Sequence, residues 1–502
     1  MSTFLDRAIG WISPARGLSR LEARARIAAV ERVRMVYDGA TTGRRSHGWR
    51  VAASDANSEV RLAAMRLRNV SRDMVRNNPF ASRAIQVIDQ NVVGAGIVPS
   101  VKTRSKARAE RVRDLIRAHL ETTDCDVTGR HDLYGLQALV MRTIVESGEA
   151  LVRRRYSADR TLALPFQMHV LEPDYLNALV DGPLPGGGFA VQGIEFDARG
   201  KRVAYHLYNE HPGSARMSFA ASSTRVPARD IAHVFRVDRP GQERGVTWFA
   251  PVILRMRDLA DFIDAQLMRQ KVAACFAGFV TSERDPSAAL FAPSADEGTG
   301  RPIETVAPGM FEYLRPGEKI EFGAPPQVGD FDPYTRATQR EIAVGLGVTY
   351  EALSGDLSQV NYSSGRMGWI EFQRSIDSWR WRMFIPQFCA RVADWTLEAA
   401  GVMAPGNSSE AAAISWTPPR REMINPKEEV PTARDTIRAG LNSWSDEVRT
   451  LGRDPEEVAA EIKADQDLFD RLGVKLDSDG RYPANAPINM IRDSSKQAEL
   501  PR

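Results

Sequence analysis

Residues 340–374 read REIAVGLGVTYEALSGDLSQVNYSSGRMGWIEFQR, and the interpretation of the whole chain starts from this stretch. Its two ends are apolar-rich and have the spacing that is typical of helices. Between them, residues 354–364 contain no Lys or Arg and only one acid, Asp356, beside short neutral polar side chains. The pattern predicts a helix, a polar loop and a second helix, with Gly355 and Gly365 as the points where the loop bends.

Long helices are predicted on both sides of this loop. Upstream, apolar residues recur at spacings of three and four from Pro251 toward Gly278, which predicts one amphipathic helix with Pro251 in its first turn. Asp332-Pro333 predicts the start of another helix, which closes near Gly345–Gly347. The upstream stripe consists of Val252, Met256, Leu259, Ile263 and Leu267.

Downstream of the loop, a third long helix is predicted, with a kink at Pro386. Its stripe is rich in aromatic side chains, and we interpret it as a face of the core rather than a cofactor site. The members of this stripe are Trp369, Phe372, Ile376, Trp379, Met383, Phe388, Val392 and Trp395.

The rest of the chain is predicted to mix helices and strands. Helices are predicted at 58–76, 80–92, 105–120 and 132–147, with a break at Asn77-Asn78-Pro79. Short β-branched and aromatic segments at 150–156, 166–171, 203–208 and 231–237 predict a β-rich module. A Pro-rich linker at 416–420 precedes a final helical module at 427–475. The predicted fold class is therefore α+β, mainly helical.

Composition narrows the class of protein. With 502 residues, 43% hydrophobic and 26% charged, the chain has the composition of a folded soluble protein. Cys125, Cys275 and Cys389 lie far apart, which fits a reducing compartment and offers no disulfide framework or zinc spacing. The longest apolar run, residues 272–280, is far shorter than the ~20 residues of a membrane span. We expect a soluble protein made in the cytoplasm, without a signal peptide or a membrane partner.

Charge is distributed unevenly along the chain. Residues 1–117 carry 23 Lys and Arg against 10 Asp and Glu, whereas the remainder carries 44 against 54. A basic N-terminal part of this kind is able to face nucleic acid or an acidic partner. It is more often a set of solvated helices whose Arg stems cover apolar surface. Charge by itself leaves both interpretations open.

Motifs of catalysis are missing from the sequence. It contains neither a phosphate-binding G-x-x-x-x-G-K-[ST] loop nor a G-x-S-x-G nucleophile elbow. His119-Leu-Glu121 followed by Cys125 is half of a zinc-deaminase signature, but the second cysteine pair is absent. The sequence therefore predicts no cofactor.

Two further sets of polar residues are candidates for a metal site or a nuclease site. His206 and His211 are the closest histidine pair, and with no third ligand nearby a structural or surface role is favoured. Asp454, Glu461 and Lys463 have the residue types of a nuclease site. They fall on an acidic amphipathic helix, where solvated charges are the usual interpretation. We therefore predict no catalytic residue and no metal site.

Several stretches occur in a fixed order along the chain. The first two are RNNPFASRAIQVIDQNVVGAGIVP (76–99) and HVFRVDRPGQERGVTWFAPVILRMRDLADFIDAQLMRQKVAA (233–274). The third is the opening stretch, 340–374, and the last is the series WTPPR (416–420), NPKEE (425–429), IRAGLNSW (437–444) and LGRDPEEV (451–458). Together, over roughly residues 60–475, they resemble the lambda-type portal proteins of tailed bacteriophages.

The resemblance implies a subunit of a ring, usually a dodecamer, with a wing, a two-helix stem, a clip and a helical crown. Residues 1–330 are implied to consist of a basic N-terminal segment 1–57, a wing 58–248, a first stem helix 249–279 and a clip 280–330. The next parts are a second stem helix 331–353, a tunnel loop 354–364, and a long wing helix with its following segment 365–415. A linker and crown 416–476 and a flexible tail 477–502 complete the chain. The stem stripe would then bury itself against neighbouring subunits.

The resemblance also implies that the polar loop is the tunnel loop, which narrows the channel and touches DNA. Duplex DNA carries one negative charge per ~1.7 Å, and each Lys or Arg against it adds affinity. A loop past which DNA slides should therefore lack such groups. The residues expected to face DNA are Ser358, Gln359, Val360, Asn361, Tyr362, Ser363 and Ser364, with Gly355 and Gly365 as hinges.

The implied function is a conduit at one capsid vertex through which double-stranded DNA is packaged and ejected. The implied partners are other copies of the chain, the large terminase subunit, the head–tail connector, and the major capsid or scaffold protein. The implied location is the virion, with assembly in the host cytoplasm. The main alternative, a nuclease or packaging ATPase, lacks the phosphate loop and metal cluster it requires. A shorter type of ring-forming head–tail adaptor fits the order of motifs less well.

Overall fold

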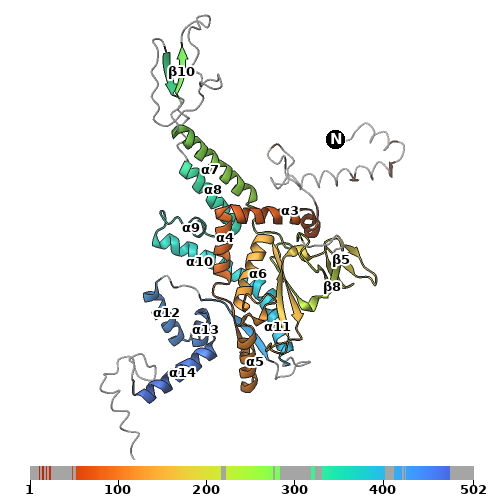
Figure 1. The fold of residues 1–502 in the computed structure, drawn as a ribbon, viewed down its shortest axis with the longest axis vertical. Coiled ribbons are helices and arrows are strands. Elements are labelled where there is room, and N and C mark those ends of the chain that lie inside the picture. The colour runs from red at the N-terminus through yellow and green to blue at the C-terminus, as the bar shows by residue number, and fades with distance from the viewer. Residues whose placement is uncertain are drawn as a thin grey trace, which may run out of the picture. The chain divides into compact units, whose positions relative to one another are not determined.

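A computed structural model describes residues 53–215, 222–274, 278–282, 318–322, 331–401, 412–420, 423 and 425–474, with nine isolated positions between residues 11 and 48. Residues 1–55 form one unit and residues 56–502 another, and every element named below belongs to the second. Almost all of the predicted N-terminal segment 1–57 and of the clip 280–330, and the whole tail 477–502, lie outside the described residues. The chain is a mainly helical mixture of helices and sheets, which confirms the predicted class (Figure 1).

Helices α3 (Ala56–Asn77), α4 (Pro79–Val92) and α6 (Leu133–Ser147) pack on one another, and α5 (Lys106–His119) precedes α6. The predicted break between α3 and α4 is confirmed, because the Asn78 side chain accepts hydrogen bonds from Phe80 N and Ala81 N and Pro79 begins the helix. One side of α4 is fully buried, through Ala81, Ala84, Ile85, Val87, Ile88 and Val92.

A three-stranded antiparallel sheet of order β3-β2-β9 lies against α6. Its strands are β2 (Glu149–Tyr156), β3 (Phe166–Leu171) and β9 (Ile231–Phe235), close to the predicted boundaries. A second antiparallel sheet of five strands carries its own small core, formed with Leu151 and Ile231 of the first sheet. This sheet consists of β4 (Gly182–Pro183), β5 (Phe189–Val191), β6 (Ile194–Phe196), β7 (Arg202–Tyr208) and β8 (Ser223–Pro227).

A two-stranded antiparallel ribbon joins distant parts of the chain. Strand β1 (Val98–Lys102) pairs with β12 (Ala413–Thr417), with Pro99 opposite Trp416. Neither strand was predicted, because each is short and pairs only across more than three hundred residues of sequence. Trp416 and Thr417 are therefore buried strand residues, and the predicted linker is shortened to the residues that follow them.

Helices α7 (Ile253–Ala274) and α8 (Phe331–Leu346) pack together, as Figure 1 shows. Beyond them, β10 (Gly278–Ser282) and β11 (Glu318–Phe322) form an antiparallel ribbon. Pro251 lies two residues before α7, not in its first turn as predicted, and Asp332 lies inside α8 rather than at its N-cap. The predicted second stem helix is divided at Gly347, where φ is +72°, and Thr349 then caps the short helix α9 (Tyr350–Ser354).

The long helix after the polar loop has three parts. It begins as α10 (Tyr362–Trp379), continues as a π-helical segment η6 (Arg380–Cys389), and ends as α11 (Ala390–Ala399). Pro386 lies inside the π-helical segment, whose wider turn relieves the clash that a proline ring makes in an α-helix. The aromatic stripe is core, as predicted: Phe372, Ile376, Met383, Phe388, Val392 and Trp395 are buried, and Trp369 and Trp379 pack against them.

The C-terminal module consists of α12 (Pro426–Arg438), α13 (Trp444–Thr450) and α14 (Pro455–Leu472). These helices bury very little, because α12 has no buried residue and α13 and α14 bury only Val448 and Pro455. Among the described residues, no helix combines the length and apolarity needed to cross a membrane.

Asp89 of α4 makes stability depend on pH. Burial raises the pKa of its carboxyl to about 6, and Arg142, 4.0 Å away, only partly offsets this. A folded pKa above the unfolded value gives stability that is present below about pH 4 and is lost as pH rises through 6. We expect Asp89→Asn to stabilise the protein, by a margin that grows by about 1 kcal/mol between pH 5 and pH 8, because the carboxyl is partly exposed.

Chemical unfolding of the purified protein at the two pH values would measure this margin. Asp73→Asn, which removes an exposed carboxylate from α3, is the matched control and should show no such growth with pH. An Asp89→Asn margin that is the same at pH 5 and pH 8 would contradict the prediction.

Candidate assembly surfaces and polar loop

The polar loop is shorter than the sequence predicted and comprises residues 355–361. Helix α9 ends at Ser354, and the following Gly355 adopts φ +73°, a conformation that favours glycine. Leu357, Ser358 and Gln359 form the exposed tip, and Leu357 is 67% exposed. The tip carries no charge, and it includes Leu357, which was not among the residues predicted to face DNA.

Asp356 fixes the base of this loop. Its carboxylate accepts hydrogen bonds from Ser358 N (3.0 Å) and Tyr350 Oη (2.8 Å). The bonds from Ser358 and then Tyr350 lower the pKa of Asp356 to about 2, with Arg336 of α8 contributing from 3.9 Å. The single acid of the loop is therefore ionised and turned toward the neighbouring helices.

Reciprocal hydrogen bonds at the start of α10 end the loop. Asn361 Oδ1 accepts from Ser364 N (2.8 Å), and Ser364 Oγ accepts from Asn361 N (3.1 Å). This capping box places Tyr362, Ser363 and Ser364 in the first helical turn rather than in the loop. Gly365 is also helical, so it is not the hinge we predicted; a Cβ there would lie 2.9 Å from Val360 Cγ1.

The stripe of α7 is divided between the core and the surface. Val252, Met256 and Leu259 are buried against this chain's own core, and Ile263 is half-buried there. Only Leu267, at 51% exposed, stands free in the single chain. The burial of the first three within the subunit differs from the expectation that the stripe needs a neighbour, because α8 and the body of the protein already cover them.

The crossing of α7 and α8 depends on Gly345. A Cβ at this position would lie 2.3 Å from Val252 Cγ1, a distance that real contacts do not reach. From the sequence, Gly345 is expected only to form part of a helix end. In the structure it is the small residue that lets the two helices approach.

Gly345→Ala is expected to destabilise the protein by about 1–2 kcal/mol, because overpacking against buried Val252 outweighs the better helix propensity of alanine. Gly368→Ala in α10 is the control, since nothing lies within 4 Å of its Cβ position, and it should stabilise slightly. Thermal unfolding of both variants measures the difference. Equal melting temperatures for the two variants would refute the role of Gly345.

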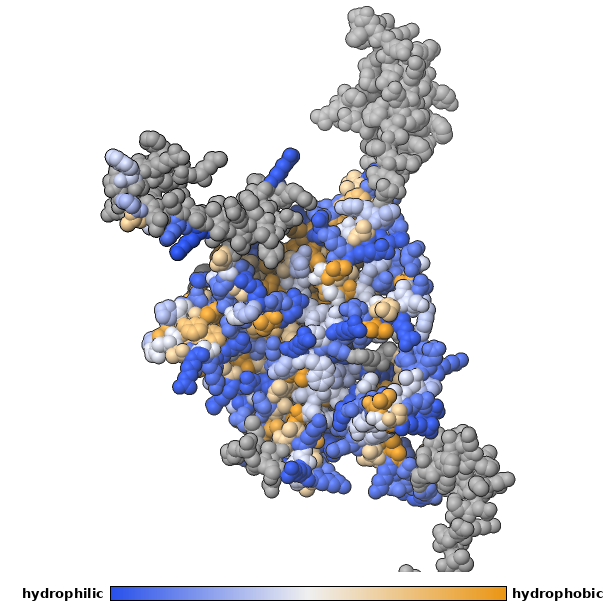
Figure 2. Space-filling model, turned by 180° about the vertical axis from the view of Figure 1, so that it is seen from behind, coloured by the Kyte–Doolittle hydropathy of each residue, from blue (hydrophilic) through white to orange (hydrophobic). Residues whose placement is uncertain are grey.

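Large apolar side chains remain exposed on several helices of the single chain, and Figure 2 shows such side chains in patches among hydrophilic ones on one face. Val344 of α8 is 80% exposed and Leu254 of α7 is 73% exposed. Others lie on α10 and η6 (Met367, Ile370, Trp381) and on the C-terminal module (Val430, Leu441, Trp444, Ile462, Leu468, Leu472). Exposed apolar faces of this extent are typical of surfaces that bind other protein chains.

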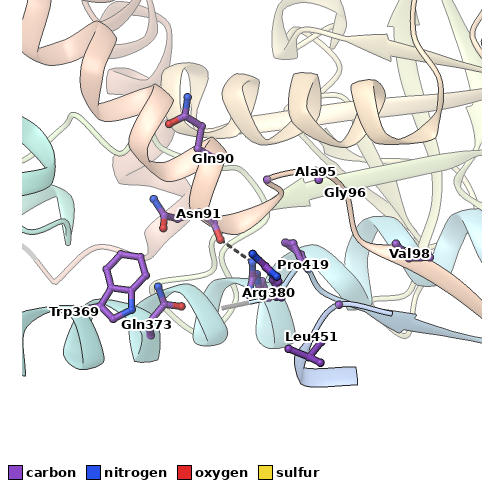
Figure 3. Close-up of a pocket in the computed structure, with 13 residues that line it drawn as sticks. Gln90, Asn91, Ala95, Gly96, Val98, Trp369, Gln373, Arg380, Pro419 and Leu451 are labelled. Carbon is purple, nitrogen blue, oxygen red and sulfur yellow. Dashed lines mark hydrogen bonds between the residues drawn. The ribbon is translucent and has the colours of Figure 1, made fainter. Parts of the chain in front are cut away.

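A cavity of about 410 Å³ lies where α4, α10 and residues 419–420 and 451–452 meet (Figure 3). Arg380, which is 4% exposed, lines it and donates from Nε to Val92 O (2.8 Å) and from Nη2 to Asn91 O (2.7 Å). Burial lowers the pKa of Arg380 to about 10. These bonds satisfy carbonyl groups at the C-terminal end of α4, so Arg380 ties the long helix to the core.

The deaminase-like residues have structural roles. His119 is buried, and its Nε2 lies 2.8 Å from Phe166 O. Burial and nearby acids raise the pKa of the Cys125 thiol to about 12, which suppresses the thiolate that a metal or a nucleophilic reaction needs.

The histidine pair is separated in the structure. His206 Nε2 lies 3.4 Å from Glu195, whereas His211 approaches Glu172 and Asp174. Within the described ranges, the last three are the one group with the spacing to hold a metal ion. Arg72 already pairs with both carboxylates, at 3.1 and 2.6 Å, so a guanidinium offsets their charge in the structure without a metal ion.

The nuclease-like set consists of helix-capping and surface charges. Asp454 accepts a hydrogen bond from Glu456 N and caps α14. Glu461 forms an ion pair with Arg453. The two acids thus have a cap role and an ion-pair partner that explain them without catalysis.

Comparison with known proteins gives matches over most of the chain. The family model described as phage portal protein, lambda family, matches residues 42–380. A probable portal protein of Halomonas phage phiHAP-1 is 27% identical over 483 residues and covers 91% of each chain. Portal protein B of Escherichia phage lambda is 24% identical and covers 78% of this chain and 81% of its own. A chain in the neck of a native gene transfer agent particle is similar at 17% identity and a TM-score of 0.45, covering 79% of this chain and 99% of that chain.

Proposed function

Because the chain belongs to the lambda family of phage portal proteins, we propose that its copies form a closed ring around a channel for double-stranded DNA at one vertex of the capsid. The family match over residues 42–380 carries this proposal. As a phage portal protein, the chain is a structural component of the particle rather than an enzyme.

The exposed apolar faces support assembly. A single chain that leaves Val344, Leu254 and the apolar side chains of its C-terminal helices in water lowers its free energy by burying them against copies of itself. Contacts between unlike faces of identical subunits close into a ring when the rotation from one subunit to the next is a whole-number fraction of a full turn. We propose a dodecamer, as the family resemblance implies.

The parts of the subunit are proposed on the same basis. Residues 58–248, together with the long helix α10–η6–α11, form the wing, α7 and α8 form the stem, and α12 to α14 form the crown. The ribbon β10–β11 belongs to the clip. The polar loop is proposed as the tunnel loop, with residues 355–361 in place of the broader 354–364.

The uncharged tip of the loop supports contact with moving DNA. Phosphate contacts from Lys and Arg add affinity, which would oppose sliding. Ser358 and Gln359 instead present neutral groups, and the carboxylate of Asp356 is hydrogen-bonded to Tyr350 and Ser358.

The proposed partners are double-stranded DNA, the large terminase subunit, the head–tail connector and the major capsid or scaffold protein. The proposed location is the virion vertex, after assembly in the host cytoplasm.

Negative-stain electron microscopy of the purified protein, with mass measurement of the same fraction, tests the ring. Closed rings with a channel wide enough for duplex DNA would support the proposal and give the symmetry. A stable monomer at high concentration would contradict it, because the exposed apolar faces would then have no ring partner.

Removal of residues 1–55 is expected to leave ring formation intact, because all elements of the proposed wing, stem and crown lie in residues 56–502. We expect the truncated protein to enter capsids less often, since the basic segment is a candidate contact with capsid or scaffold. Electron microscopy measures the first outcome, and the amount of portal in purified capsids measures the second. Loss of rings on truncation would refute the prediction.

A further inference from the structure

Two helices of opposite charge lie against each other at one side of the described structure. Residues 102–117, at the end of β1 and through α5, contain seven Lys and Arg and two acids. Helix α14 contains six acids and two bases. This basic stretch belongs to the basic N-terminal part of the chain, for which charge by itself predicts no single partner.

The contact between the helices consists of two ion pairs. Arg113 Nη2 lies 3.0 Å from Glu456 Oε2, and Arg117 Nη2 lies 2.7 Å from Glu457 Oε1. Arg113 and Arg117 are four residues apart and therefore share a face of α5. Lys106 and Glu110 lie on this face as well, and Arg104 lies next to it in sequence.

Helix α14 is held only weakly against α5. A hollow of about 580 Å³ separates the helices, and Arg104, Lys106, Arg113 and Arg117 line it together with Glu456 and Glu457. Glu456 is 70% exposed and Arg117 is 55% exposed, so water screens both ion pairs. Exposed ion pairs of this kind each contribute roughly 0.2–1 kcal/mol. Helix α14 adds no buried side chain except Pro455, so little apolar burial holds it in place.

Two cations on the rim of the hollow are not ion-paired with any residue in the described part of the chain. Arg104 and Lys106 are exposed and form no ion pair with any other residue that the structure describes. Their charge adds to that of the two paired arginines on one continuous surface. We call the four residues Arg104, Lys106, Arg113 and Arg117 the α5 basic face.

We propose that the α5 basic face binds the phosphate backbone of double-stranded DNA, and that α14 covers this face as an intramolecular competitor when DNA is absent. The proposal rests on the proposed function for the expectation that DNA comes close to this protein. Because the ion pairs with α14 are weak and sensitive to salt, a polyanion with a higher charge density can replace them.

The chemistry favours a phosphate polyanion over a small anion or an apolar partner. The face offers four cations and a single acid, Glu110, and it lacks an apolar centre of the kind that protein interfaces usually have. Arg113 and Arg117, one helical turn apart, are separated by ~6 Å along the axis of α5, so they can contact different phosphates of one duplex. The carboxylates of Glu456 and Glu457 occupy the positions that phosphates would take.

The test is binding of a fluorescently labelled 30-base-pair duplex to the purified full-length protein, followed by anisotropy from 50 to 200 mM NaCl. The double variant Glu456→Gln/Glu457→Gln weakens the competitor and is expected to bind DNA about fivefold more tightly. Arg104→Ala/Lys106→Ala removes two cations that do not pair with α14. This variant is expected to bind more weakly and to lower the slope of log K against log salt by about 1.8.

A matched control separates this local effect from a change in net charge. Asp465→Asn/Asp467→Asn removes the same charge from the same helix, at exposed positions that are not among the residues lining the hollow. Its DNA affinity should stay close to that of the unmodified protein. Electron microscopy of each variant gives ring formation independently, so failure of the ring proposal and failure of this one are distinguishable.

Either of two results would overturn the proposal. If both acid-to-amide variants tighten DNA binding equally, net charge rather than uncovering of α5 is responsible. If Arg104→Ala/Lys106→Ala leaves the affinity and the salt slope unchanged, DNA does not bind this face. An α5 basic face that binds an acidic protein instead would give this second result.

Discussion

Glu149→Ala is expected to lower the free energy of unfolding by about 3–5 kcal/mol, the largest effect we predict for a single substitution. Glu149 begins β2 and is fully buried. It accepts hydrogen bonds from Arg244 Nη2 (2.6 Å), from His233 Nε2 (2.9 Å) and from Gly245 N (2.8 Å). Truncation leaves the guanidinium of Arg244 buried without its carboxylate, and this uncompensated charge is the source of the cost.

The effect should also depend on pH. Burial by itself would raise the pKa of Glu149, but Arg244 and His233 outweigh it and hold the pKa well below its usual range. A depressed folded pKa gives stability that is present above the unfolded pKa of about 4.5 and is lost as pH falls through the folded value. The difference between Glu149→Ala and the unmodified protein should therefore shrink in acid.

Urea unfolding at pH 7 and pH 4 measures both parts of this prediction. Asp261→Ala is the control, because its 3.8 Å ion pair with Arg257 is exposed on both sides and should be worth less than about 1 kcal/mol. A cost for Glu149→Ala as small as that of the control would mean that water reaches Arg244 once the carboxylate is gone.

Gln359→Lys is expected to slow or stall DNA packaging. The substitution places a cation at the exposed tip of the polar loop, and each added phosphate contact increases the salt slope of binding by about 0.9. In a ring every copy contributes one such contact, so the effect is multiplied by the number of subunits. Asn361 is a poorer choice for the same test, because its side chain caps α10 and replacing it would also cost about 1 kcal/mol of helix stability.

An in vitro packaging assay with terminase measures the rate at several salt concentrations. Gln359→Met keeps the length of the side chain without the charge and should package at the normal rate. We expect the defect of Gln359→Lys to lessen as salt rises, since screening weakens phosphate contacts. Normal packaging by Gln359→Lys at low and high salt alike would show that the loop does not contact DNA during packaging.

Most helices and the longer strands could be predicted from the sequence because their signals are local. Asn78-Pro79 specifies the boundary between α3 and α4 through a side-chain cap and a first-turn proline. The stripe from Trp369 to Trp395 specifies one long helix, because its periodicity survives the change from α- to π-helical turns. The polar loop was also visible, although its C-terminal limit was misplaced, since the pairing of Asn361 with Ser364 was not recognised as a capping box.

Contacts between distant residues were not predictable in this way. The pairing of β1 with β12 joins short segments whose own preferences are weak. The sequence predicts Gly345 as part of a helix end, and only the structure shows that Val252 packs against it. The hydrogen bonds of Glu149 join strands β2 and β9 and the segment that holds Arg244, which no spacing in the sequence connects. The proposed loop contacts and the α5 basic face likewise depend on which surfaces neighbouring chains and DNA reach.

The sequence by itself determined the class of the fold, the positions of most helices and the neutral character of residues 357–359, because propensity, capping and periodicity act within a few residues. Only the tertiary structure decided that Val252, Met256 and Leu259 are buried within the subunit, and that α14 lies on α5. Burial and ion pairing depend on which elements meet in space, and the chain brings those elements together only after the local structure has formed.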